Sequence, residues 1–176
     1  MLDTHELKKF LCILNDASVS YFVSGGVGLD GLRGKLTREH KDLDVYMFES
    51  DLTRLFQKLK NCGYSCFRKL NKFEIQGDGI IVDILPLVNE KNTAYLKGNI
   101  ADTRFPKEIF ENYLEGNLDG ITFQVVPGEI FALEMPYSKH PEDKKDAALV
   151  SYNKLLFKRI ESIQKELPPN IVLEEV

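Results

Sequence analysis

The stretch that most constrains this chain is a short apolar run that ends in two glycines and leads to a second strand-like run holding two aspartates. The glycines are Gly25 and Gly26, and Asp42 and Asp44 flank Leu43. Because successive side chains of a strand point to opposite faces, both aspartates are expected on one face, about 7 Å apart at the backbone. Two carboxylates that converge to about 4 Å repel by roughly 4 kcal/mol at an effective dielectric of 20. A divalent cation removes that repulsion, so the pair indicates a metal site suited to phosphate chemistry.

A third carboxylate stands in the most strongly β-prone run of the chain, 80–85. Asp83 has apolar neighbours on both sides in this run. Leaving it charged and unpaired among apolar groups would be costly. We therefore expect Asp83 to join the site of Asp42 and Asp44.

The spacing of apolar residues predicts helices and strands around these motifs. Helices are expected from a cap at Thr4, over 27–32 with a stop at Gly34, and from a cap at Ser50 or Asp51 to Gly63. Strands are expected over 21–23, 42–48, 65–70, 72–76, 80–85 and 121–126. The signals weaken over 89–120, where 107–114 is the one short helix expected. Further helices are expected over 127–134 and from Pro141 in a pattern that continues to Lys165.

Composition narrows the class of protein. The chain has 176 residues, 43% of them apolar, which indicates one domain able to bury a core. A net charge of -4 without a basic tail argues against an extended nucleic-acid partner. The odd set of Cys12, Cys62 and Cys66 has neither disulfide nor zinc-ligand spacing, and no run has signal-peptide or membrane-span character. We expect a cytoplasmic protein with reduced thiols that does not enter a membrane.

The glycine turn is a candidate phosphate cradle. Backbone N–H groups at Gly25 and Gly26, where a helix begins, can bind phosphate oxygens. The helix dipole contributes only about 0.3–1 kcal/mol, so cations must supply much of the binding. Arg38 and Lys41 are the nearest candidates in sequence, with Arg33 and Lys35 behind them.

Each of these features also has a purely structural interpretation. A glycine pair after a strand is usually only a turn, and Asp-Leu-Asp is frequent on half-exposed strands. For His40 a structural hydrogen bond is the better interpretation, and Asp30 is expected to cap or pair on the surface of its helix. The order of glycine turn, helix, Asp-x-Asp strand, hairpin and lone strand aspartate favours a functional site.

At these residues the chain resembles the DNA-polymerase-β-like nucleotidyltransferase superfamily, whose signature is a glycine pair followed by an Asp-x-Asp strand. The sequence from Thr37 to Asp44, Thr-Arg-Glu-His-Lys-Asp-Leu-Asp, is most similar to the lincosamide and aminoglycoside nucleotidyltransferases. The resemblance is specific over 24–45 and extends less tightly to Asp83. The charged stretch from His140 to Asp146 resembles a helix start that many relatives carry, more weakly. Val27 stands where the antibiotic enzymes have tryptophan.

The resemblance implies an α+β fold with a mixed β-sheet flanked by helices and with C-terminal helices. It implies a catalytic core over 1–126 and a helical region over 127–176 packed on it. The implied activity is Mg²⁺-dependent transfer of a nucleoside monophosphate, AMP, from an NTP to a hydroxyl of a small molecule such as an antibiotic, with pyrophosphate released.

The implied site residues follow the motif. The metal ligands and catalytic carboxylates, for two Mg²⁺ ions, are Asp42, Asp44 and Asp83. The groups that bind the NTP phosphates are Ser24, Gly25, Gly26, Arg38 and Lys41. Asp83 is either a metal ligand or the general base, since both roles need similar positions.

Two other functions stay open. The missing tryptophan and the modest size suit an enzyme that modifies a protein, as toxin–antitoxin relatives of this fold do. The poorly aligned second half leaves a non-catalytic nucleotide-binding or interaction module as the third possibility. The sequence gives no oligomeric state.

Overall fold

The structure is a computed structural model, and it describes residues 2–77, 79–96, 103–134, 141, 145 and 150–165. One mixed sheet runs through it, with the strand order β3-β4-β5-β2-β1-β9-β8 and with β6 and β7 continuing from β5. The strands are β1 (Tyr21–Val23), β2 (Leu43–Phe48), β3 (Ser65–Arg68), β4 (Phe73–Gly77), β5 (Ile80–Glu90), β6 (Thr93–Leu96), β7 (Thr103–Pro106), β8 (Leu114–Leu118) and β9 (Ile121–Val125). The pairs β2–β5 and β1–β9 are parallel and the other pairs antiparallel.

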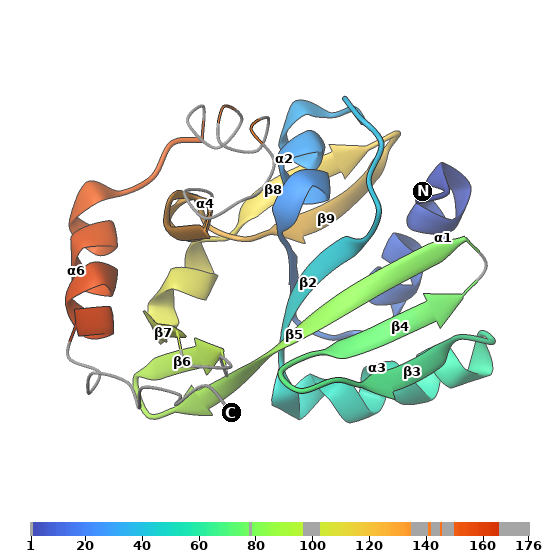
Figure 1. Ribbon diagram of the computed structural model, residues 1–176, viewed down its shortest axis with the longest axis horizontal. Coiled ribbons are helices and arrows are strands. Elements are labelled where there is room, and N and C mark those ends of the chain that lie inside the picture. The colour runs from blue at the N-terminus through green and yellow to red at the C-terminus, as the bar shows by residue number, and fades with distance from the viewer. Residues whose placement is uncertain are drawn as a thin grey trace, which may run out of the picture.

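Helices flank this sheet. They are α1 (Thr4–Asp16), α2 (Gly25–Arg33), α3 (Glu49–Asn61), a 3₁₀ helix (Lys107–Asn112), α4 (Gly128–Glu134) and α6 (Lys154–Lys165). Figure 1 shows α3 and the β3–β4 hairpin at one end of the molecule and α6 at the other, with β5 running between them. The predicted α+β class with a mixed sheet and flanking helices is confirmed.

The core forms because the apolar periodicities converge on the sheet. Alternation in β2 buries Leu43, Val45 and Met47 completely. The apolar stripe of α3, which packs against β2 and β5, buries Leu55 and Leu59. The opposite face of β2 carries Asp44, so the burial of one face presents the carboxylate on the other.

Two helix caps differ from the prediction. The α1 cap is Asp3, whose side chain accepts a hydrogen bond from the Glu6 N–H at 2.9 Å, and Thr4 is the first helical residue. A carboxylate one residue earlier satisfies the same unpaired helix N–H groups. The α3 cap is Phe48 rather than Ser50 or Asp51, because β2 runs directly into the helix and leaves no loop for a polar cap.

The second half holds elements that the sequence analysis missed. Strands β6 and β7 lie in the region of weak signals, and within 107–114 a 3₁₀ helix is followed by the start of β8. Of the helix expected from Pro141 to Lys165, residues 142–144 and 146–149, which hold most of the charged start, lie outside the described residues. Residues 150–153 are not helical, so α6 begins anew at Lys154 rather than continuing an earlier helix.

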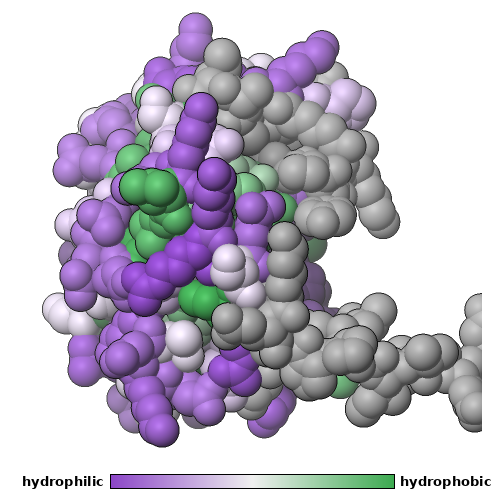
Figure 2. All heavy atoms as spheres, turned by 90° about the vertical axis from the view of Figure 1, so that its left-hand side faces the viewer, coloured by the Kyte–Doolittle hydropathy of each residue, from purple (hydrophilic) through white to green (hydrophobic). Residues whose placement is uncertain are grey.

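The surface on the α6 side is mostly hydrophilic, with hydrophobic side chains exposed between the hydrophilic ones (Figure 2). The exposed large hydrophobic side chains of this part of the chain are Tyr152 and Leu155. All three cysteines are reduced and exposed. Among the described helices, none combines the length and the apolar character that a membrane span requires.

Candidate nucleotide and metal site

The glycine turn joins the end of β1 to the N-terminus of α2. Ser24 is the N-cap residue of this helix, and its N–H donates to the Asp44 carbonyl at 2.9 Å. Gly25 has a φ of +61°, in the left-handed region that favours glycine. A Cβ at this position would lie 2.6 Å from Asp44 Oδ2. Position 25 therefore needs glycine for two reasons: the backbone has a positive φ, and the Asp44 carboxylate leaves no room for a Cβ.

The second glycine of the turn, Gly26, lies against the side chains of Arg38 and His40 from the following loop. A Cβ on Gly26 would lie 2.3 Å from Arg38 Nη2 and 2.9 Å from His40 Nδ1. Arg38 therefore lies at the N-terminus of α2, where unpaired N–H groups attract anions. This placement supports the predicted role of Arg38 beside a phosphate.

Three acidic side chains form a row across neighbouring strands. Asp44 of β2 is the register partner of Asp83 of β5, and Asp83 is the partner of Glu74 of β4. Register partners present their side chains on the same face of a sheet. The structure thus brings Asp44 and Asp83 together, as the sequence predicts, on the face that meets Gly25.

A lysine lies within this row of carboxylates. Lys72, in the β3–β4 loop, donates from Nζ to Asp83 Oδ2. Burial alone would lower the pKa of Lys72, but the contact with Asp83 and the charges of Asp44 and Glu74 outweigh it and raise that pKa. The other oxygen, Asp83 Oδ1, is buried and has no hydrogen-bond partner.

The remaining predicted residues lie less close. Asp42 is exposed and precedes β2, and Lys41 beside it is also exposed. Within the described ranges, no three His, Cys, Asp or Glu side chains converge closely enough to hold a metal ion. The roles given to these residues therefore stay predictions.

The carboxylate row nevertheless suits a hard cation. Asp83 is 7% exposed, carries one unpartnered oxygen and has a cationic group on the other. Asp44 Oδ2 faces the glycine turn, where phosphate oxygens would lie. Oxygen donors of this kind are those that Mg²⁺ prefers. Asp44 and Asp83 would hold it.

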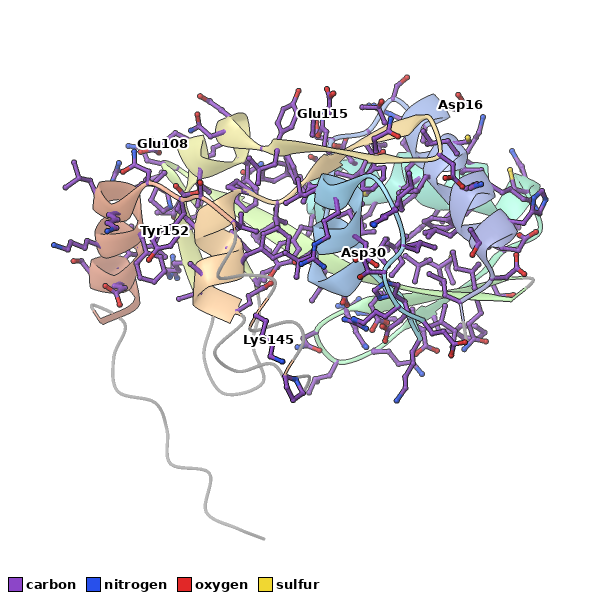
Figure 3. The ribbon with its side chains drawn as sticks, turned by 90° about the horizontal axis from the view of Figure 1, so that it is seen from above. Asp16, Asp30, Glu108, Glu115, Lys145 and Tyr152 are labelled. Carbon is purple, nitrogen blue, oxygen red and sulfur yellow. The ribbon has the colours of Figure 1, made fainter. Side chains whose placement is uncertain are left out.

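A second acidic cluster fixes the loop that carries the motif. Asp30, in α2, is buried and accepts hydrogen bonds from the Thr37 N–H at 2.8 Å, Thr37 Oγ1 at 2.5 Å and His40 Nε2 at 2.8 Å. Burial alone raises the pKa of Asp30, but these hydrogen bonds outweigh it and lower that pKa. The structural role expected for His40 is confirmed. The surface position expected for Asp30 is wrong, because the loop folds back over α2 and covers it (Figure 3).

Glu134, at the end of α4, is a site neighbour that the sequence analysis missed. Ser24 Oγ donates to Glu134 Oε2 at 3.0 Å, although Ser24 was expected to line the phosphates. Burial raises the pKa of Glu134 to about 8, the Ser24 hydrogen bond opposes this shift, and the charge of Asp44 adds to it. The available signal was a glutamate directly after the apolar stretch 130–133, and the sequence alone gives this glutamate no partner. For Lys72 the available signal was its position two residues before Glu74, which places both side chains on one face of the strand.

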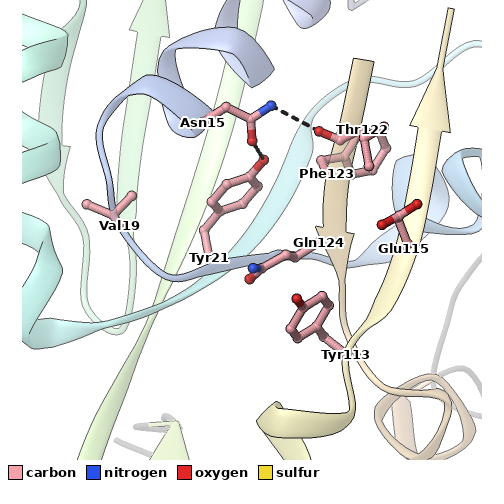
Figure 4. Close-up of a pocket in the computed structure, with 8 residues that line it drawn as sticks. All are labelled: Asn15, Val19, Tyr21, Tyr113, Glu115, Thr122, Phe123 and Gln124. Carbon is pink, nitrogen blue, oxygen red and sulfur yellow. Dashed lines mark hydrogen bonds between the residues drawn. The ribbon is translucent and has the colours of Figure 1, made fainter. Parts of the chain in front are cut away.

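A cavity of about 290 Å³ lies elsewhere, against α1, β1, β8 and β9. In Figure 4 Tyr21 donates to Asn15 Oδ1 at 2.6 Å, and Asn15 Nδ2 donates to the Thr122 carbonyl at 2.9 Å. None of the predicted site residues lines this cavity. The acidic row and the glycine turn therefore define a separate site.

The family model of the aminoglycoside-2''-adenylyltransferases matches residues 6–130, which include the glycine turn, the Asp-x-Asp strand and Asp83. The chain belongs to this family. The predicted kinship with the antibiotic-modifying nucleotidyltransferases is thereby confirmed.

One relative in sequence is a lincosamide resistance protein of Staphylococcus haemolyticus, 37% identical over 59 residues. That match covers 34% of this chain and 37% of the relative, so the chain aligns with well under half of that protein.

Three solved structures are similar to this chain over nearly its whole length. The lincosamide adenylyltransferase LnuA, solved with lincomycin bound, has a TM-score of 0.65 at 23% identity, covering 92% of this chain and 98% of its own. The solution structure of ANT(2'')-Ia has a TM-score of 0.62 at 16% identity, covering 93% of both chains. The crystal structure of ANT(2'')-Ia with adenylyl-2''-tobramycin has a TM-score of 0.58 at 16% identity, covering 92% of this chain and 94% of its own. These likenesses confirm the nucleotidyltransferase fold.

Proposed function

We propose that this chain transfers AMP from ATP to a hydroxyl group of a small-molecule antibiotic and releases pyrophosphate. The observation that carries the proposal is the pairing of Asp44 with Asp83 on adjacent parallel strands, on the face that meets the glycine turn. Membership of an adenylyltransferase family supports AMP as the transferred group. Lincomycin and adenylyl-tobramycin in the neighbouring structures support an antibiotic acceptor.

The residues divide the work of binding. The N–H groups at the start of α2 and the guanidinium of Arg38 bind phosphate oxygens, with Lys41 at the exposed edge. Asp42, Asp44 and Asp83 would hold two Mg²⁺ ions. When bound, these ions neutralise the triphosphate charge and acidify the attacking hydroxyl. The turn and the carboxylates fix the phosphate end of the nucleotide, and holding both reactants in line supplies much of the rate.

The division of the chain into a core over 1–126 and a helical region over 127–176 belongs to the same proposal. The Ser24–Glu134 hydrogen bond supports contact between the two parts at the site. The packing of α6 against β7 supports contact at the far end.

The test is incubation of the full chain with Mg²⁺ and radiolabelled ATP plus lincomycin or tobramycin. We expect pyrophosphate release and an acceptor whose mass rises by one AMP. Repeating the assay with each of the other NTPs and without Mg²⁺ tests the donor and the metal. No product with any donor and either acceptor would overturn the proposed antibiotic activity.

The alternative acceptor is a protein, and the same assay separates it. Labelled AMP appearing on a polypeptide band, with none on either antibiotic, would favour the protein-modifying activity. Calorimetry that finds no binding of NTP in the presence of Mg²⁺ would favour an interaction module without catalysis.

A further inference from the structure

The β3–β4 loop places one lysine on the acidic face of the sheet. Lys72 directly precedes β4 and lies two residues before Glu74, so strand alternation puts both side chains on one face. Glu74 is in register with Asp83, and Asp83 with Asp44. Lys72 therefore belongs to the face that carries all three carboxylates, and its ammonium contacts Asp83.

The contact divides the two oxygens of Asp83. Oδ2 accepts from the Lys72 ammonium, while Oδ1 is buried without a hydrogen-bond partner. A carboxylate that is 7% exposed needs a neutralising charge, and here the chain supplies it from its own side chain. A divalent ion on Asp83 would bring further positive charge to a carboxylate that the Lys72 ammonium already neutralises, so the two cations compete for Asp83.

We propose that Lys72 is a resident counter-ion, which occupies Asp83 while the metal site is empty and must leave that carboxylate when a divalent ion binds. The inference rests on the metal site of the proposed function. Its consequence is that the chain binds a divalent ion weakly by itself, because each ion must first displace an ammonium group.

A second lysine of the same loop offers a matched comparison. Lys69 Nζ lies 3.5 Å from Glu74, and the two side chains are 49% and 19% exposed. The side chains of Lys72 and Asp83 are 34% and 9% exposed. Both lysines bring one positive charge to the row, but only Lys72 contacts Asp83. Removing either lysine changes the net charge equally, so a difference between them measures displacement rather than charge.

The experiment is a titration of the full chain with Mn²⁺ and no nucleotide, followed by the electron paramagnetic resonance of the unbound ion. We expect Lys72→Met to bind Mn²⁺ at least about tenfold more tightly than the unsubstituted chain, and Lys69→Met less than about twofold more tightly. In thermal unfolding, Mn²⁺ should raise the Tm of Lys72→Met by more than it raises the Tm of Lys69→Met. Equal affinities for the two variants, or no tightening in Lys72→Met, would overturn the proposal.

A measurement on the unsubstituted chain covers the case in which Lys72→Met does not fold. Titration with Mg²⁺ should shift the side-chain Cε NMR signal of Lys72 and leave that of Lys69 almost unmoved. A Lys72 signal that stays fixed at saturating Mg²⁺ would overturn the proposal. The outcome is separable from the proposed function, because metal affinity can respond to Lys72 in a chain that transfers no AMP, and transfer can occur with affinities that ignore Lys72.

Discussion

Two buried aspartates in this fold have opposite surroundings. Asp30 accepts hydrogen bonds on both oxygens, from Thr37 and His40, and Arg33 Nη1 lies 3.8 Å away. Asp83 has the Lys72 ammonium on one oxygen and no hydrogen-bond partner on the other, which is buried. Both are almost inaccessible, at 1% and 7% exposed.

The difference separates structural from functional carboxylates. A satisfied buried carboxylate fixes the chain around it, and removing it leaves its partners unpaired. An unsatisfied one costs folding free energy that a ligand can recover. Asp30 therefore orders the loop that carries the motif, while Asp83 has an oxygen that can still bind a ligand.

The largest expected effect is on catalysis. Asp44→Asn keeps the shape of the side chain but removes the charge beside Asp83 and the glycine turn. We expect AMP transfer to fall by at least about 10³-fold, since metal-bound charge stabilisation is worth several kcal/mol. The Tm should change by only a few degrees. A variant that keeps most of its turnover would contradict the assignment of Asp44.

The next effect is on stability, and it acts on the other aspartate. Asp30→Ala leaves His40 and Thr37 without their acceptor, and we expect a loss of about 2–4 kcal/mol in the free energy of unfolding. Urea denaturation measures it. Asp16→Ala, an exposed change at the end of α1, should alter this free energy by no more than about 0.5 kcal/mol. Similar losses in both variants would remove the structural role of the Asp30 cluster.

A pair of glycine substitutions sharpens the picture of the turn. Gly25 and Gly34 both have positive φ, but a Cβ on Gly34 meets nothing within 4 Å, whereas one on Gly25 meets Asp44. We expect Gly34→Ala to cost about 1 kcal/mol of stability and Gly25→Ala about 2–3 kcal/mol. Calorimetric titration should also show weaker binding of ATP to Gly25→Ala alone. Equal costs would mean that Asp44 does not press against the turn.

The smallest expected effect depends on pH. Because burial raises the pKa of Glu134 from 4.5 to about 8, the folded chain binds more protons than the unfolded chain between these values. Stability from this group is therefore present below about pH 4.5 and lost as the pH rises to 8. Glu134→Gln, which cannot ionise, should gain stability relative to the unsubstituted chain as the pH rises from 5 to 9. If the difference in the free energy of unfolding between Glu134→Gln and the unsubstituted chain stayed constant across that pH range, the raised pKa of Glu134 would be contradicted.

Much of the fold was predictable because its signals are local. The apolar stripes of α1 and α3, the glycine that ends α2 and the β3–β4 hairpin all follow from spacing and turn chemistry. The strands β6 and β7 were not predictable, because Thr-Ala-Tyr-Leu and Thr-Arg-Phe-Pro are short and lack a clear alternation. They form because β6 pairs with β5 and β7 pairs with β6, which extends the sheet.

The site was predictable where one motif carried it. The cost of burying an isolated carboxylate predicted that Asp83 lies beside Asp44. The structure places the two residues in register on adjacent strands. The roles of Lys72 and Glu134 were not predicted, because each residue reaches the site from another element. A single sequence does not show which distant charged residues are in contact. The burial of Asp30 escaped for the same reason, since its partners lie in a loop without regular structure.

The length of β5 has a mechanical consequence. Its first part pairs with β4 and β2 and carries Asp83, and its last part pairs with β6 at the other end of the molecule. Because β5 is hydrogen-bonded to neighbouring strands at both of its ends, it should open only as a whole. The amide protons along it should therefore exchange with solvent as one cooperative unit. An acceptor that stiffens the β6–β7 end would then slow exchange at Asp83, far from its own contacts.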